Sequence, residues 1–201
     1  MVNESSPEKT APQPLYLVQR FVNSVDLEDG DEELSSPEAL RDWLAERELM
    51  DPGDAVGPAD LRRALEAREG LRALMLANSG LPLEADKVEG LDRVASRARV
   101  RVSFVAGERP ALVTDERGVD GALARLMAIV AAAAEDGSWE RMKACRHDTC
   151  LWAFYDRSKN RSGKWCRMEA CGNVEKARAF RERRRRGGAR TSAGSRGGGG
   201  A

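Results

Sequence analysis

The feature that most constrains this chain is the spacing of its four cysteines, which form two Cys-x4-Cys pairs separated by fifteen residues. Two short pairs with a spacer of this length are typical of a tetrahedral four-thiolate zinc site, in which each pair forms a turn that carries two sulfurs. No cysteine is left over, and a chain expected in the cytoplasm argues against disulfides. We therefore expect one structural Zn²⁺, with four free or redox-active thiols as the alternative. The expected ligands are Cys145, Cys150, Cys166 and Cys171.

The residues near these cysteines favour a structural metal over a catalytic one. A catalytic zinc keeps an open coordination position, usually beside nitrogen or oxygen ligands and an acid or base. His147, the only histidine, lies between the first two cysteines, and we interpret it as a surface residue or a neighbour of the ligands. Asp148 and Asp156 are interpreted as turn or ion-pair groups. An iron–sulfur cluster would also use four thiolates, but no partner chemistry accompanies it. The sequence has no nucleophile–base pair and no phosphate-binding loop, so we do not expect an enzyme.

Charge divides the chain into two parts, although 33 Lys and Arg balance 33 Asp and Glu overall. Residues 136–201 hold 17 basic and 7 acidic residues, whereas residues 1–135 hold 16 basic and 26 acidic residues. All four cysteines and three of the four tryptophans lie in the basic part. This split predicts two electrostatically distinct bodies and places the function in the basic one.

Apolar runs in the sequence are short. The longest covers residues 126–134, whereas a helix that spans a bilayer needs about 20 apolar residues. The N-terminus has neither a basic start nor an apolar stretch, so we expect no secretory signal. These features predict a cytoplasmic protein without a membrane partner.

The pattern of apolar residues predicts a mostly helical N-terminal domain over residues 15–136. Serine and proline at positions 36 and 37 are typical of a helix start, and Pro52 ends that helix. Val100, Val102 and Phe104 alternate with polar residues, which predicts a half-buried strand. Residues 111–114 are its expected partner in a hairpin. The other expected helices cover residues 17–25, 59–77, 84–98 and 119–134.

Composition sets the remaining boundaries. Residues 1–14 and 187–201 contain too few large apolar residues to form a core, and we expect a disordered arm and a disordered tail there. Residues 137–186 form the expected zinc module. The predicted fold class is therefore α+β, in which a mostly helical N-terminal domain with a small β-hairpin precedes a small zinc-binding hairpin-plus-helix module.

Basic side chains gather in two segments of this module. Between the cysteine pairs, aromatic strand formers flank the turn-forming residues 160–163, which predicts a hairpin with a basic tip. After Cys171, helix-forming residues predict a basic helix in which Ala170, Val174 and Ala177 face the metal. Cations at this density repel one another, and nucleic acid is the natural polyanion to neutralise them. A solvated basic tail is the alternative for residues 184–186. The candidate DNA contacts are Arg157, Lys159, Arg161, Lys164, Lys176, Arg178, Arg183 and Arg186.

Several stretches of this sequence resemble one protein family. Cys145-x4-Cys150, Phe154-Tyr155-Asp156-x-Ser158-x-Asn160 and Trp165-Cys166-x-Met168-x-x-Cys171-Gly172-Asn173 resemble the CGNR-type zinc finger of bacterial proteins. Phe21-Val22-Asn23-Ser24-Val25-Asp26 and Ser36-Pro37-x-x-Leu40-x-x-Trp43-Leu44 resemble the opening of the ABATE domain, which precedes this finger in the family. The resemblance covers about residues 15–186. It implies a stress-induced transcriptional regulator with a zinc-bound, DNA-binding finger whose metal is held by the four cysteines.

Two positions depart from the family pattern. Val174 stands where the family has the arginine of its name, and Gly163-Lys164 replaces a basic pair. If that arginine contacts DNA in relatives, this chain lacks the contact. The other interpretation is that the valine packs against the module.

The leading hypothesis is a DNA-binding transcription regulator whose partner is double-stranded DNA. The acidic domain would then supply either homodimerisation or a pocket for a small-molecule effector. One alternative is an adaptor whose finger binds an acidic protein. A further alternative is an RNA-binding module in which Trp152, Tyr155 or Trp165 stacks on bases.

Overall fold

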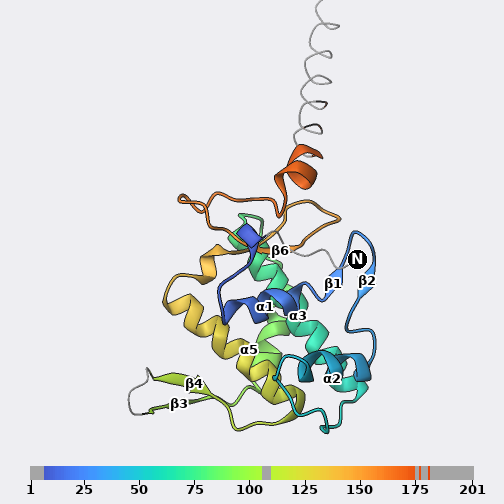
Figure 1. The fold of residues 1–201 in the computed structure, drawn as a ribbon, viewed down its shortest axis with the longest axis vertical. Coiled ribbons are helices and arrows are strands. Elements are labelled where there is room, and N and C mark those ends of the chain that lie inside the picture. The colour runs from blue at the N-terminus through green and yellow to red at the C-terminus, as the bar shows by residue number, and fades with distance from the viewer. Residues whose placement is uncertain (1–6, 106–109, 175–176, 178–180, 182–201) are drawn as a thin grey trace, which may run out of the picture. The chain divides into compact units, whose positions relative to one another are not determined.

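Helices make up about half of the computed structural model, which describes residues 7–105, 110–174, 177 and 181 (Figure 1). The chain divides into two compact units, Met1–Cys166 and Arg167–Ala201. The first unit contains two short 3₁₀ helices, η1 (Pro7–Lys9) and η2 (Trp139–Arg141). Its α-helices are α1 (Leu15–Val22), α2 (Pro37–Ala45), α3 (Pro58–Asn78), α4 (Ala85–Ala95) and α5 (Gly118–Glu135). No helix in residues 7–105 and 110–174 is both long and apolar enough to cross a membrane.

The start of α2 follows the predicted capping. The Ser36 hydroxyl accepts a hydrogen bond from the backbone N–H of Ala39 at 3.2 Å, and Pro37 occupies the first helical position. This side chain satisfies one of the N–H groups that a helix start leaves unpaired. The expected helix over residues 17–25 is shorter than predicted, because α1 ends at Val22 and Val25 already belongs to a strand.

Helix α3 is the centre of the first unit, because it contacts the other four α-helices. Ala64, Ala67, Leu71 and Met75 lie on its buried side. The closest approach is to α4 at Gly70, where an added Cβ would lie 2.5 Å from the Leu91 Cβ. Only glycine therefore allows α3 and α4 to pack at this distance.

Three short antiparallel hairpins accompany these helices in the described residues of the first unit. Strand β1 (Val25–Asp26) pairs with β2 (Asp31–Glu32), and β3 (Arg101–Ser103) pairs with β4 (Ala111–Val113). Strand β5 (Met142–Ala144) pairs with β6 (Ala153–Tyr155). The structure thus confirms the predicted fold class, including a hairpin near residues 100–114.

The ribbon of β3 and β4 differs from the prediction in its burial. The two strands lie beside α5 (Figure 1), and Val102 opposes Leu112 across the ribbon. The apolar alternation predicted that Val100, Val102 and Phe104 are half-buried, but all three are exposed. The strand prediction is confirmed and the burial prediction is wrong, since β3 and β4 form only a two-stranded ribbon.

The hairpin of the zinc module also differs from the prediction. The sequence placed both strands between the cysteine pairs, with Arg157, Lys159, Arg161 and Lys164 at the tip. In the structure β6 instead pairs with β5, the strand that precedes it in the sequence. The turn between the two strands therefore contains the first cysteine pair. Residues 156–165 form a loop without a strand. The predicted second strand is therefore wrong, because the hydrogen bonds of this loop go to the buried side chains described below.

In the second unit, Met168–Gly172 form a π-helical turn, η3, which continues helically through Asn173 and Val174. Ala170, Val174 and Ala177 are exposed, whereas the sequence predicted that this stripe is packed. Part of the predicted basic helix, including Lys176, Arg178, Arg183 and Arg186, lies outside the described residues. The predicted tail over residues 187–201 and the first six residues of the predicted arm also lie outside them. The rest of that arm includes Ala11, whose backbone N–H donates to the Gln19 Oε1 at 2.7 Å.

Candidate metal centre and nucleic-acid interface

The first cysteine pair lies in the turn that joins β5 to β6. The backbone N–H of Cys145 donates to the carbonyl of Trp152 at 2.9 Å, which extends the ladder by one step. The backbone N–H groups of Cys150 and Leu151 both donate to the carbonyl of His147, at 3.0 and 3.2 Å. Leu151 has a φ of 47°, so the chain turns sharply as it enters β6. These bonds fix the backbone that carries the first two sulfurs.

Polar side chains on α1 and at the C-terminal ends of α1 and α3 bind both strands of this hairpin. Asn23 pairs with Ala153 as a neighbouring strand would, since its Oδ1 accepts from the backbone N–H at 2.7 Å and its Nδ2 donates to the carbonyl at 2.9 Å. Gln19 donates to the same carbonyl at 3.1 Å. At the other strand, the Ser79 hydroxyl donates to the carbonyl of Ala144 at 2.6 Å. The sequence did not predict these contacts, because Asn23 and Ser79 lie more than 60 positions from the residues that they bind.

The four cysteine sulfurs lie within 4.8 Å of one another, and all four residues are buried. The Sγ atoms of Cys150 and Cys166 are 3.5 Å apart, and all four thiols are free of disulfides. A tetrahedral zinc with Zn–S bonds of about 2.3 Å requires sulfurs about 3.8 Å apart. The donor set and the spacing therefore fit one structural Zn²⁺, as the sequence predicted.

The protonation of the cluster also suits a metal. Hydrogen bonds from Cys150 and Cys166 lower the pKa of the Cys145 thiol, and hydrogen bonds with Cys145 and Cys166 raise the pKa of Cys150. Zinc binds thiolates, so it would take the place of the protons in these hydrogen bonds. His147 lies outside the cluster, and its Nδ1 is 3.1 Å from the Thr149 hydroxyl.

Four of the predicted DNA contacts come together on the loop that follows β6. Arg157, Lys159, Arg161 and Lys164 are all exposed. The Arg157 guanidinium lies 5.5 Å from the centre of the Tyr155 ring and donates to the carbonyl of Thr10 at 2.8 Å. Arg161 forms an ion pair with Glu140. We call residues 157–164 the basic loop.

The aromatic residues beside the basic loop serve the core. Trp152, Phe154 and Tyr155 are all buried, with Trp152 only 3% and Tyr155 only 8% exposed. Bases stack on rings that present a free face. The alternative in which Trp152 or Tyr155 stacks on RNA bases is therefore wrong. Trp165, the third residue of that hypothesis, is half-buried.

Below the basic loop lies a buried ion pair that the sequence did not reveal. Lys143 of β5 donates from its Nζ to the Asp156 Oδ2 at 2.8 Å, and both side chains are almost fully buried. Burial raises the pKa of Asp156, but hydrogen bonds from Lys143, Ser158 and Gly163 outweigh it, so the pKa lies well below its usual range. Asp156 was predicted to be a turn or ion-pair residue, whereas its partner was not identified.

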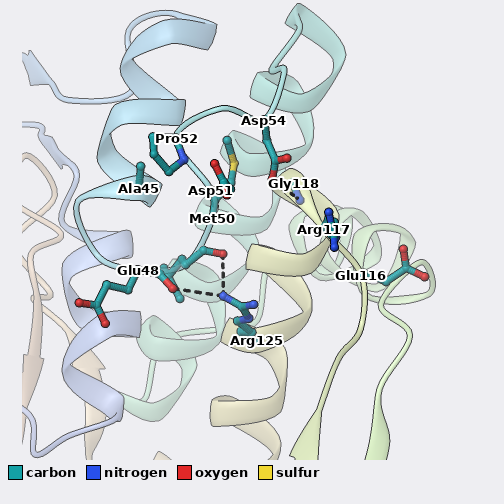
Figure 2. A pocket seen from close by; sticks show the side chains of 11 residues that line it. Ala45, Glu48, Met50, Asp51, Pro52, Asp54, Glu116, Arg117, Gly118 and Arg125 are labelled. Carbon is teal, nitrogen blue, oxygen red and sulfur yellow. Dashed lines mark hydrogen bonds between the residues drawn. The ribbon is translucent and has the colours of Figure 1, made fainter.

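The helical domain contains a pocket of about 530 Å³ (Figure 2). The loop after α2 forms one wall, and the start of α5 forms the other. Arg125 closes one side, since its Nη1 donates to the carbonyls of Glu48 and Leu49 at 3.2 and 3.0 Å. The Asp54 carboxylate accepts the backbone N–H of Gly118 at 3.0 Å. This pocket is a candidate location for the effector that the sequence analysis left open.

Two family models match this chain. The first covers residues 16–136 and is the ABATE model, described as "Putative stress-induced transcription regulator". This match includes more than half of the chain. The chain belongs to the ABATE family. A second model, the CGNR zinc finger, matches residues 141–184 of this ABATE protein. No curated protein matches the chain.

The two matches agree with the resemblance found in the sequence. The ABATE match begins at the second residue of α1 and extends past the end of α5, so it includes nearly all of the five α-helices. The CGNR match includes the β5–β6 hairpin and the four cysteines. Family and cysteine cluster together identify a zinc-binding protein of a transcription-regulator family.

Proposed function

We propose that this ABATE protein regulates transcription in the cytoplasm by binding double-stranded DNA through its CGNR zinc finger. The observation that carries the proposal is the basic loop, which places four exposed cations beside a buried four-sulfur cluster. In this proposal Cys145, Cys150, Cys166 and Cys171 hold one zinc. The basic loop and the basic residues after Val174 neutralise DNA phosphates. Catalysis has no part in this function.

The four cations of the basic loop are not equally available for DNA. Arg157 and Arg161 already have partners within the protein, at Thr10 and Glu140. In the described part of the chain no ion pair involves Lys159 or Lys164. A phosphate can therefore bind these two lysines without breaking an internal contact. We expect Lys159 and Lys164 to contribute most.

Salt titration of duplex binding tests the proposal. Each neutralised phosphate adds about −0.9 to the slope of log affinity against log salt concentration, so a Lys159→Ala/Lys164→Ala variant should lose about 1.8 from that slope. Arg62→Ala/Lys87→Ala is the matched control, since it removes two basic residues of the helical domain. The control should bind like the wild type. Failure of the wild type to bind duplexes at about 50 mM salt would reject DNA binding and favour the adaptor.

Val174 offers a second test in the opposite direction. The residue is 49% exposed, which supports the interpretation that the chain lacks a contact that an arginine here would make. A Val174→Arg variant should then bind duplexes more tightly and add about −0.9 to the salt slope. An unchanged slope would mean that position 174 does not reach a phosphate.

Regulation is assigned to the helical domain, where a homodimer and a small-molecule effector remain separate proposals. A dimer predicts a sedimentation coefficient that rises with protein concentration. An effector in the pocket of Figure 2 predicts that Arg125→Ala changes ligand response without changing zinc content, because the Arg125 guanidinium lines the pocket and binds the carbonyls of Glu48 and Leu49.

A further inference from the structure

Lys143 is a charged residue inside the core. It is 3% exposed, and its Nζ donates to the Asp156 Oδ2 at 2.8 Å, to the Gly163 carbonyl at 3.2 Å and to the Arg161 carbonyl. A lysine ammonium has three N–H donors, and three acceptors surround this one. Lysine is almost never fully buried unless it is paired. Two of the three acceptors belong to the basic loop, so the ammonium binds the loop from below.

The carboxylate of Asp156 connects the two ends of the same loop. Its Oδ1 accepts the backbone N–H of Ser158 at 3.0 Å, and its Oδ2 accepts that of Gly163 at 2.7 Å. An added Cβ at Gly163 would lie 2.8 to 2.9 Å from the carboxylate atoms. Glycine at this position, where the resembled family has a basic residue, therefore permits the close contact.

Other hydrogen bonds close the loop on itself. The Ser158 hydroxyl accepts the backbone N–H of Ser162 at 3.1 Å, and the Ser158 carbonyl accepts that of Arg161 at 3.3 Å. Arg141 donates from its Nη1 to the carbonyls of Asp156 and Ser158, at 2.9 and 3.0 Å. Each of these contacts is a hydrogen bond, and none of them is a contact between apolar side chains. The conformation of the basic loop thus depends on a buried ion pair and its hydrogen bonds.

We propose that Lys143 and Asp156 are positioning residues for DNA binding, which hold the basic loop in the shape that presents Lys159 and Lys164 to phosphates. This inference rests on the proposed function. A surface that is already ordered loses less conformational freedom when it binds its partner. Lys143 and Asp156 need not touch DNA, and their effect on binding is indirect.

The test uses a double variant, because removal of one partner leaves a buried charge uncompensated, which costs about 3–5 kcal/mol. Lys143→Met/Asp156→Leu removes both charges and puts apolar side chains of similar shape in their place. The matched control is Lys87→Met/Glu84→Leu, which removes an ion pair of the same 2.8 Å length in a more exposed place at the start of α4. Zinc content of both variants should stay at one per chain.

Affinity and its salt dependence separate positioning from contact. The double variant should bind duplexes about tenfold more weakly at every salt concentration, because ordering of the loop now opposes binding. The salt slope should stay at the wild-type value, because the loop cations remain. The control should keep wild-type affinity. Wild-type affinity in the double variant, or a weaker affinity that comes with a smaller slope, would overturn the positioning role.

Hydrogen exchange keeps this inference separate from the proposed function. The backbone N–H groups of Ser158 and Gly163 donate hydrogen bonds to the Asp156 carboxylate. Their hydrogens should exchange with solvent slowly in the wild type and fast in the double variant. If the wild type binds no duplex, the proposed function fails and the DNA role of the loop fails with it. The exchange rates still decide whether the ion pair orders the loop, and equal rates in both proteins would reject that part too.

Discussion

Two hairpins of the same size in the first unit have opposite surroundings. Strands β3 and β4 pair over three residues each, as do β5 and β6. Every residue of β5 and β6 is buried, including a lysine, whereas β3 and β4 expose most of theirs, including valine and leucine. Apolar side chains alone therefore did not decide which hairpin enters the core. The difference lies in the side chains that approach each one.

The backbone of the buried hairpin forms hydrogen bonds with side chains that lie on helices or at helix ends. Asn23, Ser79 and Arg72 bind backbone groups of β5, β6 or the turn between them. A buried peptide group that lacks a hydrogen bond costs free energy, and these side chains remove that cost. In the β3–β4 ribbon the neighbouring side-chain pair is Arg101 with Asp115, which is exposed. The four predictions below test this comparison.

Removal of zinc should have the largest effect. Thiolate binding of zinc is worth on the order of 10–16 kcal/mol in small fingers, so a chelator should abolish slow hydrogen exchange at Cys145 and Cys150 in the β5–β6 turn. The β3–β4 ribbon should exchange at the same rate before and after chelation. Retained protection of the turn after complete loss of zinc would show that the helix side chains alone hold it.

Replacement of one phenylalanine in each hairpin region should give the next largest contrast. Phe154 of β6 is fully buried, and Phe104 beside β3 is 79% exposed. Phe154→Ala should lower the free energy of unfolding by about 3–5 kcal/mol, because it leaves a cavity. Phe104→Ala should change it by less than about 0.5 kcal/mol. Denaturant unfolding measures both, and equal losses would mean that the ribbon is buried in solution.

Asn23→Ala should have an intermediate effect. It leaves the buried N–H of Ala153 without an acceptor, which costs about 1–3 kcal/mol, while Gln19 still binds the carbonyl. Arg101→Ala on the exposed ribbon is the control and should leave the thermal midpoint unchanged. A midpoint for Asn23→Ala that equals the wild type would contradict the strand-like role of this side chain.

The last prediction concerns a change with pH, and not a loss of stability at a single pH. The folded pKa of Asp156 lies below its ordinary value, so its contribution to stability is complete above about pH 4 and is lost as pH falls towards the folded pKa. The difference in unfolding free energy between wild type and Asp156→Asn should therefore be constant near neutral pH and shrink below about pH 4. Loss of zinc in acid affects both proteins and is removed by taking the difference.

Asp115 of the exposed ribbon is the control for the acid experiment. Its pKa is also lowered, by hydrogen bonds and charge from Arg101, but water and salt screen an exposed pair. Asp115→Asn should show little pH dependence at about 0.15 M salt. A pH dependence as large as that of Asp156→Asn would mean that burial of the pair makes no difference.

Local signals in the sequence predicted much of this structure. The cap at Ser36 predicted the start of α2, because capping involves residues only three positions apart. The alternation of apolar and polar residues near Val102 predicted a strand, because this pattern also involves only neighbouring residues. Cysteine spacing predicted the metal centre, because coordination by zinc requires a limited set of turns. Each of these predictions depends on a few neighbouring residues.

Contacts between residues that lie far apart in the sequence could not be predicted from local patterns. The backbone of Ala153 in β6 is bound by Asn23, which lies 130 positions before it. Lys143 was missed because a charged residue is normally exposed and its sequence pattern gives no sign of burial. Asp156 and Gly163 were both noticed, but the ammonium that joins them comes from the opposite strand.

The two hydrogen bonds between Asn23 and the backbone of Ala153 have a practical consequence for the isolation of the zinc finger as a fragment. A recombinant fragment starting near residue 137 would lack Gln19, Asn23 and Ser79, and would expose the peptide groups that these side chains satisfy. Such a fragment would be a poor substitute for the intact protein even when loaded with metal. Screens for DNA sequences should therefore use the complete polypeptide.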